Sequence, residues 1–530
     1  MWPKLEHFNW ALDWFDHIAH ANHDTALRVV RPDGDQTVSF AALRADSARL
    51  AGWLRTIGVS RGDRVLVLLD NQVEFWELQL ALMKLRAVVV PVFTTLSPAG
   101  LAERAERAGI RHVVADAEIA TRLKLPIEPQ VKVAVGADVP GWLNYADAAG
   151  SDVEFIPEGP TGADEPLFYF FTSGTTSRPK LVVHTQVSYA VGHLSSMYFN
   201  GLRPGDVHVN VSAPGWAKHP WSSLFAPWNA EATVVTLDTR YGTADRILDT
   251  LARVEATSFC APPSVWRTLI RAGVDKHRIQ LREATSVGEP LTEDIVATIR
   301  TAWGVTVRNG YGQSEVTAMA GVTPAADTDP TSMGFALPGY RLVVRAPGGA
   351  VEDDDLDEGE LCVDLVDRPL GMMRGYLDEA GPATSVGSGR LYRTGDLVRR
   401  ESDGSLRFLG RLKDILYGTG GALISPVELE RRLSMHPAVD EVAVVPVTAE
   451  AAAPVAKAYV LLAVGWNGSA ATAKGIFRHV EVTCPRQLAL IEFIDSFPRT
   501  ESGKIHRELL RSYPRSVQTE FRAADPSDEN

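Results

Sequence analysis

Hydrophobic positions in the first part of the chain alternate between short apolar runs and longer amphipathic stretches. The runs "RVLVLL", "AVVVPVF" and "RHVVAD" are continuous enough to predict buried strands. The stretches "FAALRADSARLAGWLRTIG" and "SPAGLAERAERAG" have the spacing of apolar and polar positions that is typical of helices. Because strands that alternate with helices form parallel sheets covered on both faces, this pattern predicts an α/β fold.

The same alternation returns in the middle of the chain and then stops. The runs "HVNVSA", "TVVTLD" and "ATSFCAP" predict a second α/β unit. Between about 334 and 411, short strands with Gly-rich turns predict a small β-barrel or a distorted sheet. After about Asp414, the helix "SPVELERRLSMH" and the strands "EVAVVPV" and "KAYVLLAV" predict a compact α+β tail.

These changes of pattern suggest more than one domain, as does a length of 530 residues, which exceeds what one hydrophobic core usually covers. We expect a large N-terminal domain over residues 1–411, made of two α/β subdomains and a small β-barrel-like subdomain. A small α+β domain over residues 412–530 should follow it.

Composition and charge exclude several classes of protein. The net charge of −13 argues against nucleic acid or an anionic membrane as a general partner. Three widely spaced cysteines, Cys260, Cys362 and Cys484, argue against a disulfide framework and a structural zinc site. The longest apolar stretches contain charges and the N-terminal segment lacks a signal-peptide core, so we expect a cytoplasmic protein without a membrane-spanning helix.

One segment, "YFFTSGTTSRPKLVVHT" at 169–185, concentrates small hydroxyl side chains around Gly174 between two apolar runs. The apolar flanks predict a loop between two strands, or between a strand and a helix. Backbone N–H groups, hydroxyls and the nearby Arg178 and Lys180 are what a polyphosphate requires, although a plain surface turn has the same composition. The Walker and dinucleotide glycine patterns are both absent. A nucleotide is therefore the first hypothesis.

Five further segments follow this loop: "SVGEPL" at 286–291, "NGYGQSE" at 309–315, "LYRTGDL" at 391–397, "GRLKDIL" at 410–416 and "PRTESGKIHR" at 498–507. Together and in this order, the six segments resemble the motifs of the adenylate-forming superfamily, which includes acyl-CoA synthetases, carrier-protein adenylation domains and luciferases. The resemblance covers nearly the whole chain. The segment "PGWAKHPWSSLFAPW" at 214–228 and the opening "FNWALDWFD" resemble the medium-chain and aryl acyl-CoA synthetase branch.

The resemblance implies a two-step reaction with ATP, Mg²⁺ and coenzyme A. A carboxylate attacks the α-phosphate of ATP to give an acyl-adenylate and pyrophosphate, and a thiol then displaces AMP. It also implies that the C-terminal domain is mobile and rotates about a hinge at Lys413 between the two steps.

The resemblance assigns roles to individual residues. Catalytic roles fall on Lys504, Arg411, Glu315 and Thr172, and Glu315 is the expected Mg²⁺ ligand. Tyr311 is expected to stack on adenine. Asp396 is expected to accept hydrogen bonds from both ribose hydroxyls. The expected nucleotide-binding set is Thr172, Ser173, Gly174, Thr175, Thr176, Lys180, Gly288, Glu289, Pro290, Tyr311, Gly312, Gln313, Ser314, Asp396, Arg411 and Lys504.

The acyl pocket is predicted less directly. Aromatic residues of the 214–228 segment could wall an apolar site or belong to the core. His219 could approach the substrate carboxylate, or be a buried histidine with its own partners. The predicted pocket residues are Trp216, Ala217, Trp221, Phe225 and Gly310.

Two departures from the family pattern leave alternatives open. Ser177 replaces a usual glycine of the phosphate loop, and the segment 417–430, which would face the thiol in the second step, is about one residue longer than usual. We therefore keep two rivals to an acid:CoA ligase: an acyl-AMP ligase that loads a carrier protein, and an acyl-nucleotide-binding protein without turnover. A homodimer is compatible with the sequence, which does not decide the oligomeric state.

Overall fold

The computed structural model describes residues 4–172, 179–238, 242–349, 355–378, 381–385, 389–417, 423–448, 454–485, 487–500, 503–512 and 520–523. The chain forms two compact units: Met1–Arg341 with Asp364–Tyr392, and Leu342–Val363 with Arg393–Asn530. The predicted α/β class, with a large N-terminal and a small C-terminal part, is confirmed. The predicted boundary at 411 lies inside the second unit, and a mobile domain that begins there stays a prediction.

The first sheet of the large unit has the strand order β20-β19-β9-β8-β4-β3-β5-β6-β7. Its strands are β3 (Arg64–Leu68), β4 (Val88–Pro91), β5 (His112–Asp116), β6 (Val131–Val135), β7 (Leu143–Asn144), β8 (Pro166–Thr172), β9 (Lys180–Thr185), β19 (Gly375–Asp378) and β20 (Gly381–Ser385). The helices of this region are α2 (Phe40–Thr56), α3 (Val73–Leu85), α4 (Pro98–Arg107) and α5 (Ala117–Ala120). Strands β8 and β9 are antiparallel neighbours, so the hydroxyl-rich loop joins two strands.

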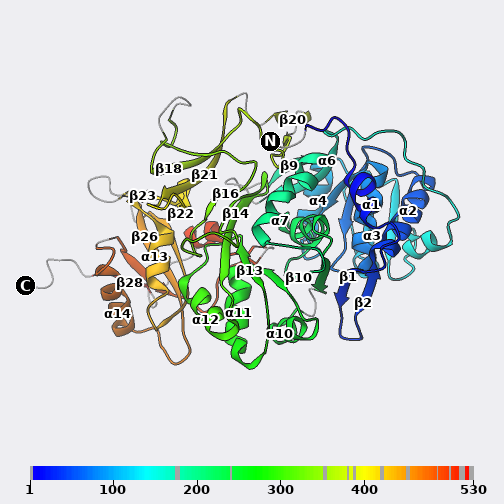
Figure 1. The fold of residues 1–530 in the computed structure, drawn as a ribbon. Helices are drawn as coiled ribbons and strands as arrows, with labels where there is room; N and C mark the ends of the chain where they lie inside the picture. Colours follow the sequence, from blue (N-terminus) through cyan, green and yellow to red (C-terminus); the bar gives the residue numbers. More distant parts are fainter. Residues whose placement is uncertain are drawn as a thin grey trace, which may run out of the picture. The chain divides into compact units, whose positions relative to one another are not determined.

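The second sheet of the large unit has the order β16-β15-β14-β13-β12-β10-β11-β1-β2. Its strands are β1 (Thr25–Val30), β2 (Gln36–Ser39), β10 (Val207–Asn210), β11 (Thr233–Leu237), β12 (Ser258–Ala261), β13 (Glu283–Val287), β14 (Val307–Gln313), β15 (Val316–Gly321) and β16 (Phe335–Ala336). Helices α10 (Ala244–Arg253), α11 (Pro263–Ala272) and α12 (Glu293–Trp303) bury their apolar sides against it (Figure 1).

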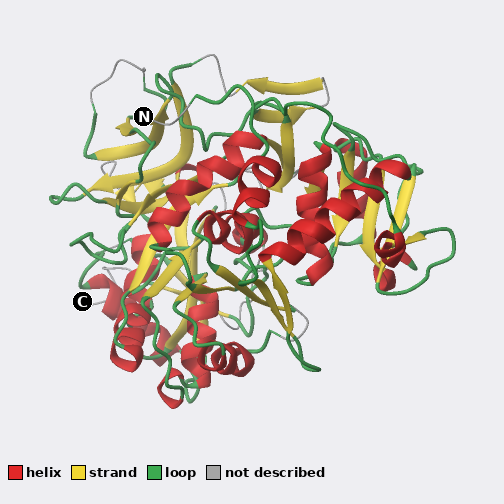
Figure 2. Cartoon of the chain, turned by 45° about the vertical axis from the view of Figure 1, so that its right-hand side comes forward, coloured by secondary structure: helices red, strands yellow, loops and turns green. Residues whose placement is uncertain are grey.

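The large unit also contains shorter helices, and Figure 2 shows helices lying against its strands. The shorter helices are η1 (Trp10–Phe15), α1 (Asp16–Ile18), η2 (Tyr145–Gly150), α6 (Gln186–Ala190), η3 (Val191–His193), α7 (Leu194–Asn200), α8 (Lys218–Pro220), η4 (Trp221–Phe225), α9 (Ala226–Asn229) and η6 (Val274–Lys276).

The described residues of the second unit form three sheets. The strands β17 (Leu342–Arg345), β18 (Glu358–Asp364), β21 (Leu391–Arg400) and β22 (Leu406–Arg411) form a four-stranded sheet, so the described residues match the predicted distorted sheet rather than a closed barrel. The tail contains η7 (Leu412–Asp414), β23 (Leu416–Tyr417), β24 (Leu423–Ile424), α13 (Pro426–Leu433), β25 (Val439–Val447), β26 (Val455–Leu462), α14 (Ala470–Glu481), β27 (Leu490–Phe493), α15 (Arg507–Arg511) and β28 (Glu520–Arg522). Its strands β23 and β24 form a two-stranded sheet, and β25, β26, β27 and β28 form the other four-stranded sheet. This is the predicted α+β arrangement.

A short stretch just before and within β19 hydrogen-bonds to both sheets of the large unit. On one side, Met373 N–H donates to the Glu315 carbonyl at 2.8 Å, and Met372 forms a bridge with Val316. On the other side, Arg374 N–H donates to the Val183 carbonyl at 2.8 Å, and Tyr376 pairs with Val182. This stretch, residues 372–377, therefore fixes β9 relative to the turn between β14 and β15.

His184 makes a second connection between β9 and the same turn. A carbonyl oxygen only accepts, so the 2.7 Å contact of His184 Nε2 with the Ser314 carbonyl places a proton on Nε2. The Nδ1 atom then accepts from the Ser188 hydroxyl, 3.0 Å away. Burial lowers the pKa of His184 to about 4, so the ring is neutral at neutral pH and keeps this tautomer.

We expect His184→Leu to destabilise the protein by roughly 1–3 kcal/mol, because the partly buried Ser314 carbonyl and the buried Ser188 hydroxyl each lose a partner. Urea unfolding measures this loss. The exposed His23 provides a control, since His23→Leu should change the free energy of unfolding by less than about 0.5 kcal/mol. Equal stability of the two variants would contradict a linking role for His184.

A buried carboxyl in α3 makes stability depend on pH. Glu77 accepts a hydrogen bond from the Tyr145 hydroxyl at 2.7 Å, and burial raises its pKa from 4.5 to about 7. The folded chain thus holds a proton between pH 4.5 and 7 that the unfolded chain has lost. The contribution of Glu77 to the free energy of unfolding therefore falls as the pH rises through this window and is constant above it.

We expect Glu77→Gln, which mimics the protonated form, to stabilise the protein relative to wild type by on the order of 2 kcal/mol at pH 8. The gain should be smaller at pH 5, where the wild-type carboxyl is mostly protonated. Urea unfolding at both pH values measures it, with Glu118→Gln on the exposed side of α5 as the control. A gain that is the same at both pH values would contradict the raised pKa.

Candidate functional site

The predicted adenine-binding residues lie where two parallel strands end. Strands β13 and β14 are parallel, and their register pairs Val287 with Gly310. The turn at Gly288, Glu289 and Pro290 therefore starts beside Tyr311. Gly288 has a φ of 98°, in the left-handed region that glycine adopts readily. Carboxyl ends of parallel strands are the usual binding edge of α/β sheets.

The residues after Gly310 form a connected polar network at the end of β14. Gln313 Nε2 donates to the Tyr311 hydroxyl at 3.1 Å, and Gln313 Oε1 accepts from the Tyr392 hydroxyl at 2.9 Å. Burial raises the pKa of Tyr392, and the nearby Glu315 carboxylate raises it further. These contacts hold the Tyr311 ring, the predicted partner of adenine, through its hydroxyl. Gly312 lies between them, where a Cβ atom would come within 2.6 Å of the Thr317 carbonyl oxygen.

Glu315 and Lys180 both contact the same tyrosine, although they come from different sheets. Glu315 Oε1 accepts a hydrogen bond from the Tyr376 hydroxyl at 2.8 Å. Lys180 Nζ lies 4.7 Å from the centroid of the Tyr376 ring, within the range of a cation–π interaction. The structure thus brings together the predicted metal ligand and the predicted phosphate-binding lysine. Sequence reasoning missed Tyr376, which follows a glycine in "RGYLDE".

The loop end of the β8–β9 hairpin carries the remaining described part of the phosphate loop. Thr172 and Lys180 are paired residues at this end, and both side chains are half-buried. Ser173, Gly174, Thr175 and Thr176, together with Ser177, lie outside the described residues, so their predicted contacts stay predictions.

In the second unit, Asp396 and Arg411 lie opposite each other on β21 and β22. Arg411 Nε is 2.9 Å from Asp396 Oδ1, and only 1% of the Asp396 side chain is exposed against 45% for Arg411. Lys413 Nζ lies 3.5 Å from Glu508 Oε2 in α15. Lys504 is half-buried at the end of a tight turn in which Thr500 N–H donates to its carbonyl at 2.8 Å.

The aromatic segment 214–228 divides between core and partly exposed positions. Phe225 is fully buried, with its ring centroid 4.9 Å from that of Trp10. Trp221 is 9% exposed and stacks on His193 at 6.1 Å between ring centroids, Ala217 is 8% exposed, and Trp216 is half-buried. Their role in an acyl pocket stays a prediction.

His219 is a buried histidine with a partner of its own, the second of the two environments that we predicted for it. Its side chain is fully buried, and Nε2 lies 2.8 Å from Asn71 Oδ1. Burial lowers the pKa of His219 to about 3, so it is neutral at neutral pH.

Lys218 is a buried cation that sequence reasoning overlooked. Its Nζ donates to Asn210 Oδ1 at 2.6 Å and lies 5.6 Å and 6.0 Å from the ring centroids of Trp216 and Trp221. Burial lowers its pKa. The signal in the sequence was a single lysine in an aromatic segment. A lysine that such a segment buries needs a specific partner, because buried lysines are rare without one.

Gly310 is a second close-packed position in β14. A Cβ atom there would lie 2.5 Å from Cζ of Phe199, and one on Gly321 would lie 2.5 Å from Cδ2 of the same ring. The Phe199 ring therefore fills the space that side chains at 310 and 321 would need.

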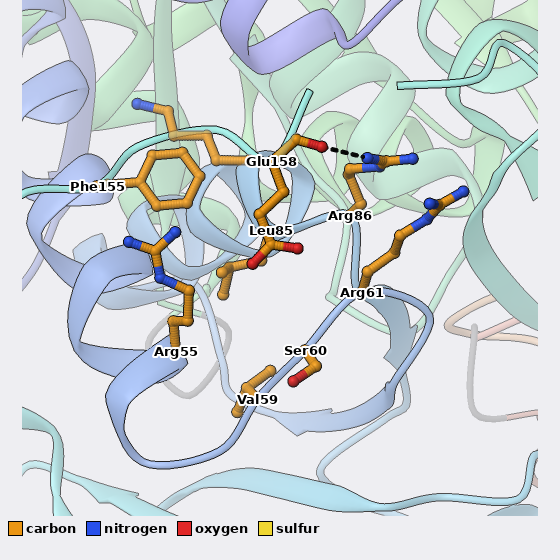
Figure 3. A pocket seen from close by; sticks show the side chains of 9 residues that line it. Arg55, Val59, Ser60, Arg61, Leu85, Arg86, Phe155 and Glu158 are labelled. Atoms are coloured by element: carbon orange, nitrogen blue, oxygen red, sulfur yellow. Dashed lines mark hydrogen bonds between the residues drawn. The ribbon is translucent and has the colours of Figure 1, made fainter. Parts of the chain in front are cut away.

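A small polar pocket elsewhere in the large unit contains none of the predicted site residues (Figure 3). Its guanidinium groups have partners: Arg55 donates to the Ile156 carbonyl at 2.7 Å, and Arg86 donates to the Glu158 carbonyl at 3.0 Å. Arg61 makes a bidentate contact with Glu165 at 2.9 and 3.0 Å. These contacts fasten the segment 154–165 to α2 and α3, which is a structural role.

The donor set around Glu315 suits Mg²⁺ held together with a polyphosphate. The described residues contain no group of three or more His, Cys, Asp or Glu side chains that could hold a metal alone. Mg²⁺ usually keeps several waters and binds through one or two carboxylates plus substrate phosphates. A single hydrogen-bonded carboxylate near a lysine fits that requirement.

Among the described residues, every helix is too short or too polar to span a bilayer.

Comparison with known proteins agrees with the motifs. The family model of the AMP-binding enzyme matches residues 15–377, and that of the AMP-binding enzyme C-terminal domain matches residues 428–504. The 4-hydroxybutyrate–CoA ligase 1 of Metallosphaera sedula is 35% identical over 525 residues, which cover 96% of this chain and 91% of the relative.

Two solved structures have the same fold. An acyl-CoA synthetase of Brucella canis is 29% identical with a TM-score of 0.74, covering 96% of this chain and 94% of that one. A benzoate CoA ligase of Burkholderia xenovorans LB400, at 23% identity and a TM-score of 0.81, covers 95% of this chain and 100% of its own, and is similar in fold. From its motifs, its fold and these matches, the chain belongs to the AMP-binding enzyme family.

Proposed function

We propose that this protein is an ATP-dependent acid:CoA ligase that activates a carboxylic acid as an acyl-adenylate and then forms the acyl-CoA thioester. The observation that carries the proposal is the contact of Lys180 and Glu315 with Tyr376, which gathers a cation and a carboxylate at the exit of the hydroxyl-rich loop. That pairing suits a metal–polyphosphate complex. The names of the M. sedula and B. canis relatives support the same class of reaction.

In the first step, the chain would position ATP rather than react with it. Lys180 and the 172–176 loop would neutralise the β- and γ-phosphates, and Tyr311 would stack on adenine above the 288–290 turn. Asp396 would accept hydrogen bonds from the two ribose hydroxyls, with Arg411 beside it. A magnesium ion held by Glu315 would withdraw charge from the phosphate oxygens when bound.

Lys504 would donate to the substrate carboxylate and the α-phosphate, where charge shifts during attack. We propose that it reaches this position only when the C-terminal domain, residues 412–530, rotates about Lys413. The contact of Lys413 with Glu508 would tie the hinge residue to α15 of the domain that rotates. In the second step the 420–425 segment would replace Lys504 and admit the thiol.

We propose a medium-sized apolar or aromatic acid as substrate and the cytoplasm as the site of action. The half-buried Trp216 and the buried Trp221 support an aromatic wall, and Ala217, Phe225 and Gly310 are the other residues that we propose for the pocket. Lys218, held between Asn210 and the two tryptophans, would give the wall one polar position. A carrier-protein thiol remains the alternative acceptor because the 417–430 segment departs from the family pattern.

The function is tested by measuring pyrophosphate release with a panel of straight-chain, hydroxylated and aromatic acids, with and without coenzyme A. We expect pyrophosphate release and AMP formation to rise together when coenzyme A is added, with acyl-CoA as product. Release without any thioester would favour a carrier-protein acceptor. No release with any acid, despite bound ATP, would favour a nucleotide-binding protein without turnover.

We expect Lys504→Ala to slow acyl-adenylate formation by about a hundredfold or more, the usual cost of removing one transition-state donor. Thioester formation from preformed acyl-adenylate and coenzyme A should stay within a few-fold of wild type, because Lys504 would have turned away by then. Each half-reaction is assayed separately, with Lys474→Ala on the exposed side of α14 as the control. Equal losses in both half-reactions would contradict the rotation of the C-terminal domain.

A further inference from the structure

Tyr376 contacts two groups that a metal–nucleotide complex would need at a fixed separation. Its hydroxyl donates to Glu315 Oε1 at 2.8 Å, and its ring faces Lys180 Nζ at 4.7 Å from the centroid. Neither partner is a sequence neighbour: Lys180 begins β9, and Glu315 lies between β14 and β15. One side chain therefore sets the position of both.

The backbone around Tyr376 is held as firmly as its side chain. Tyr376 pairs with Val182 on β9, two residues after Lys180. Three residues earlier, Met373 N–H donates to the carbonyl of Glu315 itself at 2.8 Å. The stretch 372–377, which contains the tyrosine, is thus hydrogen-bonded to the strand of one partner and to the backbone of the other.

The two contacts use different parts of the side chain. A phenol that donates to one carboxylate oxygen restricts the rotation of the carboxylate and leaves the second oxygen for another partner. The ring face attracts the ammonium group without consuming its three N–H donors, which stay available to an anion. Outer partners of metal-binding carboxylates commonly act in this way, and their loss weakens metal binding.

We propose that Tyr376 is a positioning residue that holds Glu315 and Lys180 at the spacing of one metal–polyphosphate group before the nucleotide arrives. The inference rests on the proposed function, because it takes the metal and phosphate roles of Glu315 and Lys180 from there. It goes further by separating two effects of Tyr376. Its hydroxyl would affect metal binding through Glu315, and its ring would affect phosphate binding through Lys180.

The variants Tyr376→Phe and Tyr376→Leu separate these effects. The first keeps the ring and loses the hydroxyl, and the second loses both. We expect Tyr376→Phe to weaken Mn²⁺ binding in the presence of α,β-methylene-ATP by about tenfold. Its affinity for the nucleotide at saturating Mn²⁺ should stay within about twofold of wild type. Tyr376→Leu should weaken both, because Lys180 loses its aromatic partner as well.

Electron paramagnetic resonance of Mn²⁺ measures this binding without turnover, and the Mg²⁺ concentration that half-activates acyl-adenylate formation provides a second readout. Tyr340→Phe is the matched control, since Tyr340 is a buried tyrosine whose hydroxyl contacts Thr317 on β15 at 2.5 Å. We expect this control to bind Mn²⁺ as wild type does.

Unchanged Mn²⁺ binding in Tyr376→Phe would overturn the proposal, as would equal losses in Tyr376→Phe and Tyr340→Phe, which would indicate a packing role only. A wild-type protein that binds Mn²⁺ and the analogue but activates no acid would refute the proposed function while the test of Tyr376 still stands. A wild-type protein that binds neither would refute both.

Discussion

The backbone hydrogen bonds of residues 372–377 fix the candidate site, because this stretch bonds to β9 on one side and to the Glu315–Val316 turn on the other. Each sheet of the large unit has its own hydrophobic core. Without these bonds, the position of β9 relative to the Glu315–Val316 turn would depend on side-chain contacts, such as that of His184 with the Ser314 carbonyl. Backbone hydrogen bonds are directional and costly to leave unmade when buried, so they set a separation more strictly than apolar contacts do.

The local pattern of the chain was sufficient to predict most of the secondary structure of the large unit. Runs such as "RVLVLL" and "TVVTLD" form buried parallel strands: in β3 and in β11 every position after the first is buried. The division into units was harder to predict. Strand β18 belongs to the second unit because it pairs with β21, and β17 follows it because it pairs with β18. The pairing of β18 with β21 joins residues far apart in sequence, which periodicity does not reveal.

For the site, sequence reasoning identified the residue types that carry charge or lie in a recognisable motif, such as Glu315 and Lys180. It missed residues whose role depends on their surroundings. Tyr376 stands out only once β19 is seen beside β9, and His184 only once its ring is known to be buried and neutral. The same limit applies to Phe225, whose aromatic character fits either a pocket or the core. Burial and partner identity are properties of the folded chain, so a single sequence does not contain them directly.

The Phe199 ring behind Gly310 and Gly321 has a consequence for how this protein can change over time. A side chain at 310 or 321 would overlap the Phe199 ring. A larger residue at either position is therefore accommodated only after Phe199 has been replaced by a smaller residue. A smaller residue at 199 opens a void beside the two glycines and costs packing energy, but it requires no shift of the β14 backbone. Evolved variants with a side chain at 310 or 321 are therefore expected to arise after a substitution at 199. The three positions should vary together among relatives.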